Sequence, residues 1–580
     1  MADNNKKSNF SSLSQGEGRG EALITGAEAL MRSLEHQGVK TIFGYPGGSI
    51  MPVFDALYDH RKELNHILVR HEQGATHAAQ GFARVSGEVG VCLVTSGPGA
   101  TNTITGIADA MIDSTPIVVI AGQVGTNFLG TDAFQEVDLV GITQPITKWS
   151  YQIRRAEDVA WAVARAFYVA KSGRPGPVVL DFAKNAQVEK TEYAPTKVDY
   201  VRSYLPVPEM EPEAIRKAAE LINGAKRPLV LVGQGVELGE AQQELRAFIE
   251  KAGMPAGCTL LGLSALPTNH PLNKGMLGMH GNLGPNINTN KCDVLIAVGM
   301  RFDDRVTGKL ETYAKQAKII HFDIDPAEIG KNTQPYIPVV GDIKDVLEQL
   351  TSQISGYKTS KEWIDEAEEL RQRFTHKPVC EDNGFVNPKY FLNVLSEKTN
   401  SDVYLSTEVG QNQIWCANNF NFKTPRSLLT SGGFGTMGYG LPAAIGASVA
   451  ANGSKPVIAV MGDGSFQMDL PEMGTMAQWD IPVKMVLFQN HRLGMVHEHQ
   501  YLLYKSNYQA VEIEGKPDFA MLAKAYGFES GIANENSEVS EAIDKMMAHD
   551  GSYLLIVNVN PFEPTGDALN EATLPKKEDK

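Results

Sequence analysis

Short apolar runs alternate with amphipathic helical stretches along most of the chain. Eight of these runs predict strands that are buried on both faces, because almost every residue in them is apolar. They cover residues 89–97, 115–122, 176–182, 227–233, 292–299, 317–324, 455–464 and 483–490. Most of the runs end in Gly, Asp or Asn, which is typical of a strand that leads into a ligand-facing loop. Strands that alternate with helices predict doubly wound parallel sheets, whose ligands bind beyond the carboxyl ends of the strands.

Two polar segments divide this pattern into thirds. Residues 188–213 are rich in proline and charge, and residues 356–388 are charged and carry no strand signal. Each third has the size of one α/β domain. The predicted organisation is a disordered arm over 1–21, a first domain over 22–187, a linker over 188–204, a central domain over 205–350, a linker over 351–384, a third domain over 385–562 and a C-terminal tail over 563–580.

Composition and charge exclude several classes of protein. The 580 residues are 42 % hydrophobic and 21 % charged, which is ordinary for a soluble globular chain. The formal net charge of −15 argues against nucleic acid or an anionic membrane as the main partner. The five cysteines form no C-x-x-C pair, so neither a disulfide framework nor a zinc site is expected. No apolar run approaches the roughly 18 residues of a membrane span, and the polar N-terminus does not resemble a signal peptide, so we expect a cytoplasmic protein.

The strongest chemical signal is GDGSF at residues 462–466, which is followed by Gln489 and Asn490. Asp463 comes after one predicted strand and Asn490 after the next, with 24 residues between Gly464 and Gln489 for a crossover helix. A carboxylate and an amide oxygen at neighbouring strand ends suit Mg²⁺, which keeps phosphate oxygens and water as its other ligands. The alternative for GDG alone is an ordinary turn between a strand and a helix.

A second signal is Glu72 in RHEQGATHAAQGFAR, residues 70–84. It lies at the end of a predicted strand and in the first turn of an alanine-rich helix. A carboxylate there interacts favourably with the helix dipole, and in isolation that structural role is sufficient to explain it.

Taken together, the two signals resemble the motifs of thiamin-diphosphate (ThDP) enzymes. In that family the metal motif usually reads GDG…NN, and here Gln489 stands in place of the first Asn. The resemblance implies bound ThDP and Mg²⁺, with Asp463, Asn490 and the backbone carbonyl of Arg492 as metal ligands. It also implies that Glu72 is the activating glutamate, whose carboxyl group hydrogen-bonds the aminopyrimidine ring and favours its imino tautomer.

The resemblance covers about residues 22–562 and is closest to the catalytic subunits of acetohydroxyacid synthase (acetolactate synthase). The matching segments are FGYPGGSIMPVFDAL (43–57), SGPGATN (96–102), GTDAFQE (130–136), TEVGQNQIW (407–415) and SGGFGTMGYGLPAAIGA (431–447). By this resemblance Gly47 and Gly48 face the reacting carbon, and Gln135 is catalytic. Substrate contacts are implied for Phe134, Lys184, Met495 and His499. Further ThDP contacts are implied for Pro98, Asn102, Val409, Gly410, Gln411, Asn412, Gly435, Met437, Gly462, Gly464 and Ser465.

The middle third resembles the FAD-binding set of the anabolic synthases. The segments are RPGPVVLDFAK (174–184), VGQGV (232–236), MLGMHG (276–281), GMRFDDRVTG (299–308) and HFDIDPAEIGK (321–331). Catabolic acetolactate synthases lack both this set and FAD. The implied FAD contacts are Arg174, Gly233, Gln234, Gly235, Thr259, Leu260, Met279, His280, Gly299, Arg301, Asp303, Arg305, Asp323, Ile324, Glu328, Asp342 and Ile343. Surface ion pairing is the alternative for the arginines.

The resemblance implies a reaction in two halves. Pyruvate loses CO₂ on ThDP, and the hydroxyethyl unit is transferred to a second 2-oxoacid. Pyruvate as acceptor gives 2-acetolactate, and 2-oxobutyrate gives 2-aceto-2-hydroxybutyrate, in the first common step of branched-chain amino-acid biosynthesis. The implied fold is three doubly wound α/β domains that bind pyrimidine, FAD and diphosphate. The implied partners are a second copy of the chain, in a homodimer or tetramer with active sites between subunits, and a small regulatory subunit.

Three further positions depart from the family pattern. Asn412 stands where His is usual and can donate to a diphosphate but cannot titrate. Glu408 replaces Asp, and His499 replaces a Trp that favours the longer 2-oxobutyrate. Three other functions stay open: a pyruvate oxidase with redox-active flavin, a glyoxylate carboligase, against which Glu72 argues, and a catalytically silent scaffold.

Overall fold

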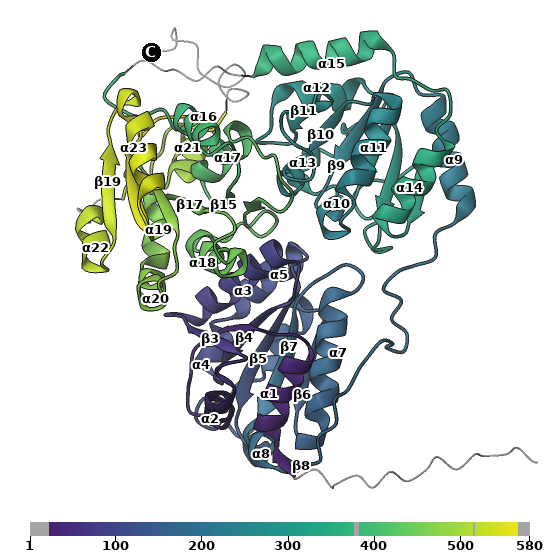
Figure 1. Cartoon of the computed structure of the whole chain (residues 1–580). Helices are drawn as coiled ribbons and strands as arrows, with labels where there is room; N and C mark the ends of the chain where they lie inside the picture. Colours follow the sequence, from purple (N-terminus) through teal and green to yellow (C-terminus); the bar gives the residue numbers. More distant parts are fainter. Residues whose placement is uncertain (1–22, 376–381, 514, 516, 567–580) are drawn as a thin grey trace, which may run out of the picture.

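The structure is a computed structural model that describes residues 23–375, 382–513, 515 and 517–566. The predicted arm over 1–21, Cys380 and most of the predicted tail lie outside the described residues. The described chain forms three α/β domains, as Figure 1 shows. Each domain is built on one six-stranded, all-parallel sheet. The predicted fold class is therefore confirmed.

The N-terminal domain has the strand order β3-β2-β4-β5-β7-β6. Its strands are β2 (Thr41–Gly44), β3 (Asn65–Leu68), β4 (Gly90–Val94), β5 (Ile117–Gln123), β6 (Trp149–Ile153) and β7 (Val178–Ala183), and a separate antiparallel pair joins β1 (Ile24–Thr25) to β8 (Lys190–Thr191). Its α-helices are α1 (Gly26–His36), α2 (Met51–His60), α3 (Glu72–Ser86), α4 (Pro98–Thr101), α5 (Ile104–Ile112), α6 (Leu139–Thr143), α7 (Val159–Lys171) and α8 (Lys184–Val188).

The central domain has the strand order β11-β10-β9-β12-β13-β14. Its strands are β9 (Pro228–Val232), β10 (Ala256–Cys258), β11 (Asn273–Met276), β12 (Val294–Val298), β13 (Lys318–Asp323) and β14 (Ile337–Val340). Its α-helices are α9 (Pro212–Asn223), α10 (Gly235–Leu238), α11 (Gln242–Ala252), α12 (Leu283–Lys291), α13 (Asp304–Thr307), α14 (Ile343–Gln353) and α15 (Lys361–Phe374).

Helix α15 lies inside the segment expected to be a linker over 351–384. It packs along α12, and buried Trp363 donates its Nε1–H to the carbonyl of Pro228 at 2.8 Å. Only Trp363 and Ala367 of this helix are buried. Its sequence therefore looks like a charged connector, although the helix belongs to the central domain.

The C-terminal domain has the strand order β16-β15-β17-β18-β20-β19. Its strands are β15 (Tyr404–Thr407), β16 (Leu428–Leu429), β17 (Val457–Gly462), β18 (Lys484–Gln489), β19 (Glu529–Ala533) and β20 (Tyr553–Asn558). Its α-helices are α16 (Pro388–Lys398), α17 (Gln411–Asn419), α18 (Gly440–Ala451), α19 (Asp463–Asp469), α20 (Met473–Trp479), α21 (Gly494–Leu503), α22 (Phe519–Ala525) and α23 (Asn536–Ala548). Short 3₁₀ turns complete the three domains at η1 (Thr126–Phe128), η2 (Gln144–Ile146), η3 (Ala156–Asp158), η4 (Leu260–Gly262) and η5 (Leu470–Glu472).

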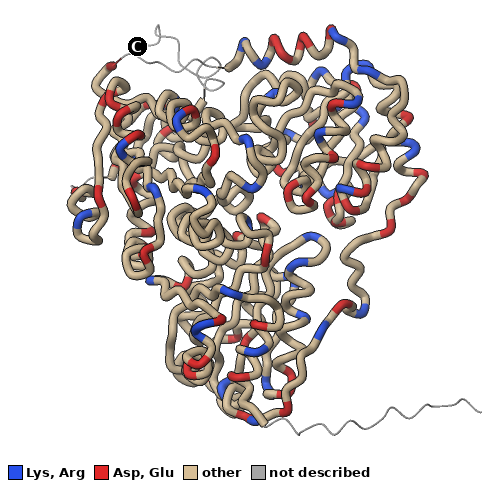
Figure 2. Tube along the Cα trace, in the orientation of Figure 1, with Lys and Arg blue, Asp and Glu red and all other residues tan. Residues whose placement is uncertain are grey.

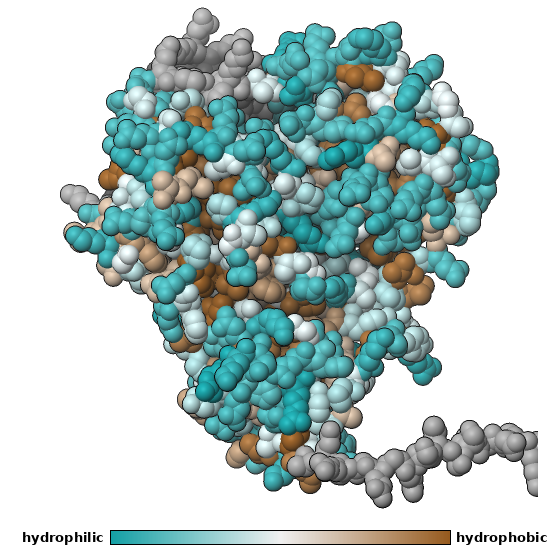
Figure 3. Space-filling model, in the orientation of Figure 1, coloured by the Kyte–Doolittle hydropathy of each residue, from teal (hydrophilic) through white to brown (hydrophobic). Residues whose placement is uncertain are grey.

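Helices α3 and α18 join the N-terminal and C-terminal domains. A Cβ atom at Gly81 would lie 2.0 Å from the carbonyl oxygen of Ala443, and one at Gly446 would lie 1.8 Å from that of Ala78. The two backbones therefore touch, and glycine is needed at both positions. One apolar core includes residues of both domains, and hydrophobic residues gather where the two domains meet in Figure 3.

Charged residues of both signs are distributed over all three domains, as Figure 2 shows. Among the described residues, we find no helix with the length and apolar character needed to cross a membrane.

Candidate active site

Asp463 and Asn490 lie side by side at the carboxyl edge of the C-terminal sheet. Strands β17 and β18 pair in parallel, with Gly462 opposite Phe488, so the residues that follow these strands emerge together. Asp463 begins α19 and Asn490 follows β18 directly, and both side chains are buried. His491 has a φ of 58°, which turns the chain back so that its N–H reaches Asp463 Oδ2 at 2.7 Å.

The Asp463 carboxylate is only partly satisfied by the protein. Its Oδ1 atom is buried and has no hydrogen-bond partner among the described residues. Burial raises the pKa of Asp463 to about 6, although the N–H groups of His491, Gly464 and Asn490 oppose this effect. An unpaired buried carboxylate is costly, and a bound cation would compensate for it.

The side chains that could bind a metal beside Asp463 offer a carboxylate oxygen and an amide oxygen. The described residues contain no cluster of three or more His, Cys, Asp or Glu side chains suited to a metal. Asn490 Oδ1 accepts the N–H of Arg492 at 3.1 Å, and Asn490 Nδ2 donates to Gln411 Oε1 at 3.2 Å. One carboxylate and one amide oxygen fit Mg²⁺ better than zinc, because Mg²⁺ accepts phosphate oxygens and water in its other positions.

The loop before α17 connects this site to its surroundings. Gln411 Nε2 donates to Glu498 Oε2 and to the carbonyl of Glu563, each at 2.9 Å. Asn412 Nδ2 donates to the carbonyls of Glu408 and Val460, each at 3.0 Å. Both N–H groups of Asn412 are thereby used within the protein. In this arrangement its side chain ties the ends of β15 and β17 together and has no N–H left for a diphosphate, contrary to the expectation from its amide.

Glu408 holds the turn that follows Met437. Its carboxylate accepts the N–H of Gly438 at 2.9 Å and that of Gly440 at 2.5 Å. Asp469 faces the same carboxylate, and burial together with the charge of Glu408 raises the pKa of Asp469 well above its usual value. Local sequence pattern does not reveal this acid pair, because Glu408 follows β15 and Asp469 ends α19, far away along the chain.

Glu72 lies at the carboxyl edge of the N-terminal sheet, as the first residue of α3. Asn102 Nδ2 donates to Glu72 Oε2 at 2.9 Å, which fixes the orientation of the carboxylate. A Cβ atom at Gly99 would lie 3.3 Å from Glu72 Oε1, so the turn that begins at Pro98 also borders it. The structure thus brings three predicted residues together: Glu72, Pro98 and Asn102.

Two loops and the first residue of α8 carry the other predicted residues of this domain to the same edge. A Cβ atom at Gly47 would lie 2.5 Å from Thr95 Cβ, and Lys184 Nζ donates to the carbonyl of Gly48 at 3.2 Å. Gln135 adopts a φ of 59° and packs against Gly97. Phe134 is 88 % exposed, so this predicted substrate contact lies on an open face of the described chain.

A cavity of about 870 Å³ is lined by all three domains. It includes every predicted FAD residue except Gly233 and Glu328. Glu328 instead accepts Arg174 Nη1 at 2.6 Å, and a Cβ atom at Gly233 would lie 2.1 Å from the carbonyl oxygen of Gly299. The C-terminal domain contributes predicted cofactor and substrate residues to the lining, namely Val409, Gly410, Gly435, Met437, Met495 and His499.

The chemistry of the cavity fits a dinucleotide. Arg174, Arg301 and Arg305 offer guanidinium donors for phosphate oxygens, and Asp323 and Asp342 offer carboxylates for ribose hydroxyls. Burial raises the pKa of Asp323 to about 6. Burial, together with His499 and Arg305 nearby, lowers the pKa of His280. His499 therefore lies near His280, which is a predicted FAD contact.

The predicted site residues therefore form three groups. Asp463, Asn490 and Arg492 lie at the C-terminal sheet, Glu72 lies in the N-terminal domain, and the predicted FAD contacts lie around the cavity. Neither Glu72 nor the residues of the Asp463 group are among those that line the cavity.

Sequence reasoning missed a buried network that reaches the cavity. Asp109 and Asp113 are buried acids spaced i, i+4 in the apolar stretch ITGIADAMID, residues 104–113. Two acids four positions apart in an apolar helix were the sequence feature that could have revealed this network.

Three family models together match most of the chain. "Thiamine pyrophosphate enzyme, N-terminal TPP binding domain" matches residues 24–142, the central domain of the same enzymes matches residues 215–350, and "C-terminal TPP binding domain" matches residues 408–557.

Individual relatives are similar over nearly their full lengths. The "Probable acetolactate synthase large subunit" of Methanocaldococcus jannaschii is 44 % identical over 572 residues, which cover 95 % of each chain. The "Acetolactate synthase isozyme 2 large subunit" of Escherichia coli K12 is 44 % identical, covering 93 % of this chain and 96 % of that protein. The "Acetolactate synthase large subunit" of Corynebacterium glutamicum is also 44 % identical, with coverages of 92 % and 86 %.

Proposed function

Because the chain belongs to the thiamine pyrophosphate enzymes and, among them, to the acetolactate synthase large subunits, we propose how its residues carry out that reaction. The reaction joins the two-carbon unit left by decarboxylation of pyruvate to a second 2-oxoacid. ThDP supplies the carbanion chemistry when it is bound. The substrates are pyruvate and, as the alternative acceptor, 2-oxobutyrate.

Asp463 and Asn490 hold Mg²⁺, with the backbone carbonyl of Arg492 as the third protein ligand. The observation that carries this proposal is the buried Asp463 Oδ1 atom without a partner, beside an amide oxygen at the neighbouring strand end. The remaining Mg²⁺ positions suit diphosphate oxygens and water. The glycines at 462 and 464 leave room for a diphosphate to approach the backbone.

Glu72 would hydrogen-bond the aminopyrimidine ring of bound ThDP and exchange a proton with it. Its carboxylate is held by Asn102 and begins a helix, so its position is fixed before a ligand arrives. Gly47 and Gly48 offer backbone N–H groups to developing negative charge on the substrate, and Gln135 lies on the adjoining loop. The exposed Phe134 and the separation of Glu72 from the cavity lining support a homodimer or tetramer, in which one subunit supplies Glu72 and another supplies Asp463.

The relatives are named large subunits, and this supports a small regulatory subunit as a further partner. We also propose that the enzyme works in the cytoplasm, where the other enzymes of branched-chain amino-acid biosynthesis would use its products. Fractionation of cells that express the tagged protein tests the location. Recovery in the membrane pellet after a high-salt wash would contradict it.

The cavity residues of the central domain support FAD as a cofactor without a redox role. Removing FAD is expected to stop acetolactate formation by the purified protein, and restoring FAD is expected to recover it. The flavin absorbance should stay that of the oxidised form while pyruvate is consumed. Acetolactate formation that is independent of FAD would contradict the proposal, and rapid flavin reduction by pyruvate would instead indicate an oxidase.

His499→Trp is expected to raise the preference for 2-oxobutyrate over pyruvate as the second substrate by about fivefold. The reason is that an indole offers apolar contact to the additional methylene, which is worth about 1 kcal/mol. Product ratios from mixtures of the two acceptors measure this preference. His499→Phe, which is smaller, should give an intermediate shift, whereas equal ratios in all three proteins would place His499 outside the acceptor pocket.

A further inference from the structure

The three domains meet at residues 430–436, which we call the junction loop. A Cβ atom at Gly432 would lie 2.6 Å from Leu261 Cγ of the central domain. One at Gly433 would lie 2.3 Å from Ile112 Cγ2 of the N-terminal domain and 2.8 Å from Arg301 Nη2 of the central domain. The loop is therefore held between the other two domains, with no space for a side chain at either glycine.

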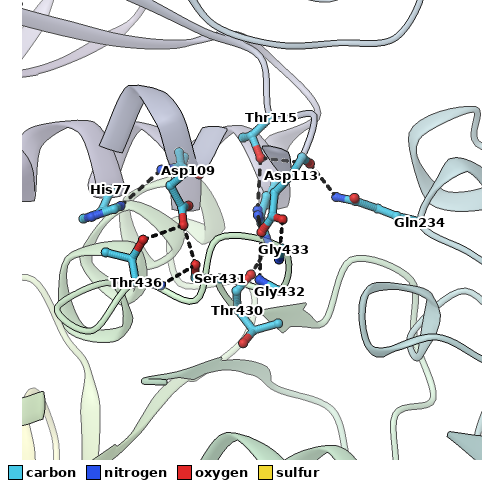
Figure 4. A network of polar contacts seen from close by, with 12 residues as sticks. His77, Asp109, Asp113, Thr115, Gln234, Thr430, Ser431, Gly432, Gly433 and Thr436 are labelled. Atoms are coloured by element: carbon cyan, nitrogen blue, oxygen red, sulfur yellow. Dashed lines mark hydrogen bonds and ion pairs between the residues drawn. The ribbon is translucent and has the colours of Figure 1, made fainter. Parts of the chain in front are cut away.

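Asp113 fixes the backbone of the junction loop. It follows the last residue of α5, and its two carboxylate oxygens accept the N–H groups of Gly432 and Gly433, each at 2.8 Å. Its backbone carbonyl accepts Gln234 Nε2 of the central domain at 2.9 Å. Figure 4 shows that this single residue bonds to segments of both other domains.

Asp109 and Arg84 complete the network from the same domain. Asp109 Oδ1 accepts the hydroxyls of Ser431 and Thr436. Arg84 Nη2 donates to Asp113 Oδ2 at 2.9 Å, and its Nη1 donates to the carbonyl of Thr430 at 2.6 Å. Burial raises the pKa of both aspartates, and the charge of Arg84 opposes this.

The junction loop borders the cavity in which both cofactor regions meet. Residues 431–435 line the cavity beside Gln234 and Arg301, which are predicted FAD contacts. Met437, the predicted thiamin contact, follows the loop and lines the same cavity. A change in the loop therefore reaches both cofactor regions.

We propose that Asp113 is a positioning residue that holds the junction loop for Met437 and that transmits occupancy of the FAD region to this loop through Gln234. The coupling half of this proposal rests on the proposed FAD site. The positioning half does not, because it concerns the protein without cofactors. The positioning role requires a carboxylate at residue 113, because the neighbouring N–H groups of Gly432 and Gly433 need two acceptor oxygens.

Hydrogen–deuterium exchange of the full chain tests the proposal on peptides that cover residues 428–440. Without cofactors, Asp113→Asn should speed exchange of this segment by about tenfold or more, because Asn offers one acceptor oxygen and turns an NH₂ group toward the other N–H. In the wild type, adding FAD should slow exchange of the same segment. In Asp113→Asn, added FAD should give little or none of that slowing.

Asp181→Asn is the matched control. Asp181 is a buried aspartate of β7 in the same domain, and its side chain accepts hydrogen bonds from Gln123 and Gln152 of that domain. Exchange over 428–440 should remain at the wild-type rate in this variant. Wild-type exchange of the segment in Asp113→Asn would overturn the positioning role, and full FAD-dependent slowing in Asp113→Asn would overturn the coupling.

If Asp113→Asn speeds hydrogen–deuterium exchange throughout the chain, Gln234→Leu tests the coupling instead. This variant keeps both carboxylate bonds to the loop and removes only the donor to the Asp113 carbonyl. Normal exchange of the loop without FAD, together with no slowing at saturating FAD, would support the coupling, and persistent slowing would overturn it. If wild-type protein binds no FAD, the proposed FAD site fails while the result without cofactors still decides the positioning role.

Discussion

Glu72→Gln is expected to lower acetolactate formation by about 10²–10⁴-fold while ThDP and FAD still bind. The amide keeps the size of the side chain, and its oxygen can still accept the hydrogen bond from Asn102. It cannot exchange a proton with the aminopyrimidine at neutral pH, so the loss should fall on kcat. Steady-state kinetics with pyruvate, together with equilibrium titration of ThDP, measure the two effects separately.

Glu63→Gln is the matched control for this experiment. Glu63 is an exposed residue of the same domain, close in sequence to Glu72, and it should keep wild-type activity. Turnover by Glu72→Gln within about tenfold of the wild type would exclude the assigned role, because a general acid–base group contributes more than that. A weakened affinity for ThDP with unchanged kcat would instead assign Glu72 to binding.

Asp463→Asn is expected to weaken Mg²⁺-dependent binding of ThDP by about 100-fold or more, and to abolish turnover at ordinary cofactor concentrations. The neutral amide can still accept the N–H of His491, so the local backbone should persist. Without cofactors the variant should unfold at the wild-type temperature or above it, because the substitution removes a buried charge whose Oδ1 has no partner among the described residues. ThDP titration at fixed Mg²⁺ and thermal unfolding of the apoprotein measure the two outcomes.

A rise in apoprotein stability together with a loss of cofactor binding would be diagnostic of a ligand site, because such sites are held in arrangements that are unfavourable without the ligand. Asp480→Asn is the control, since Asp480 is an exposed residue of the same domain in a left-handed turn that Asn also tolerates. ThDP affinity that is unaffected in Asp463→Asn would show that the metal is held elsewhere.

The buried parallel strands were predictable because they are continuous apolar runs. The predicted strands over 455–464 and 483–490 contain β17 and β18, and this was enough to bring Asp463 and Asn490 together. Strand β6, Trp149–Ile153, gave no such run, because it lies at the sheet edge and four of its five residues are only partly buried.

Polar contacts that depend on tertiary structure were not predictable from local pattern. Asn412 could be compared with its family position, but its bonds to Glu408 and Val460 depend on how β15 and β17 pair. The bonds of Asp113 to Gly432 and Gly433 span more than 300 positions of sequence. The first set of contacts depends on strand pairing within a domain and the second on the packing of two domains, and hydrophobic periodicity encodes neither.

The contact of α3 with α18 limits how this chain can be recombined with its relatives. Because Gly81 and Gly446 bring the two backbones together, a hybrid that takes its first domain from one parent and its last from another must preserve both glycines and both helix surfaces. The central domain is also tied to the C-terminal domain, because one apolar core includes residues of both, and Thr268 and Phe422 exchange hydrogen bonds across the boundary, so a replacement of the central domain must preserve that surface as well. Substitutions where α3 meets α18 should therefore be rare, and a change in one helix should be matched by a change in the other. Libraries made by swapping domains should yield folded proteins mainly when the first and last domains come from the same parent.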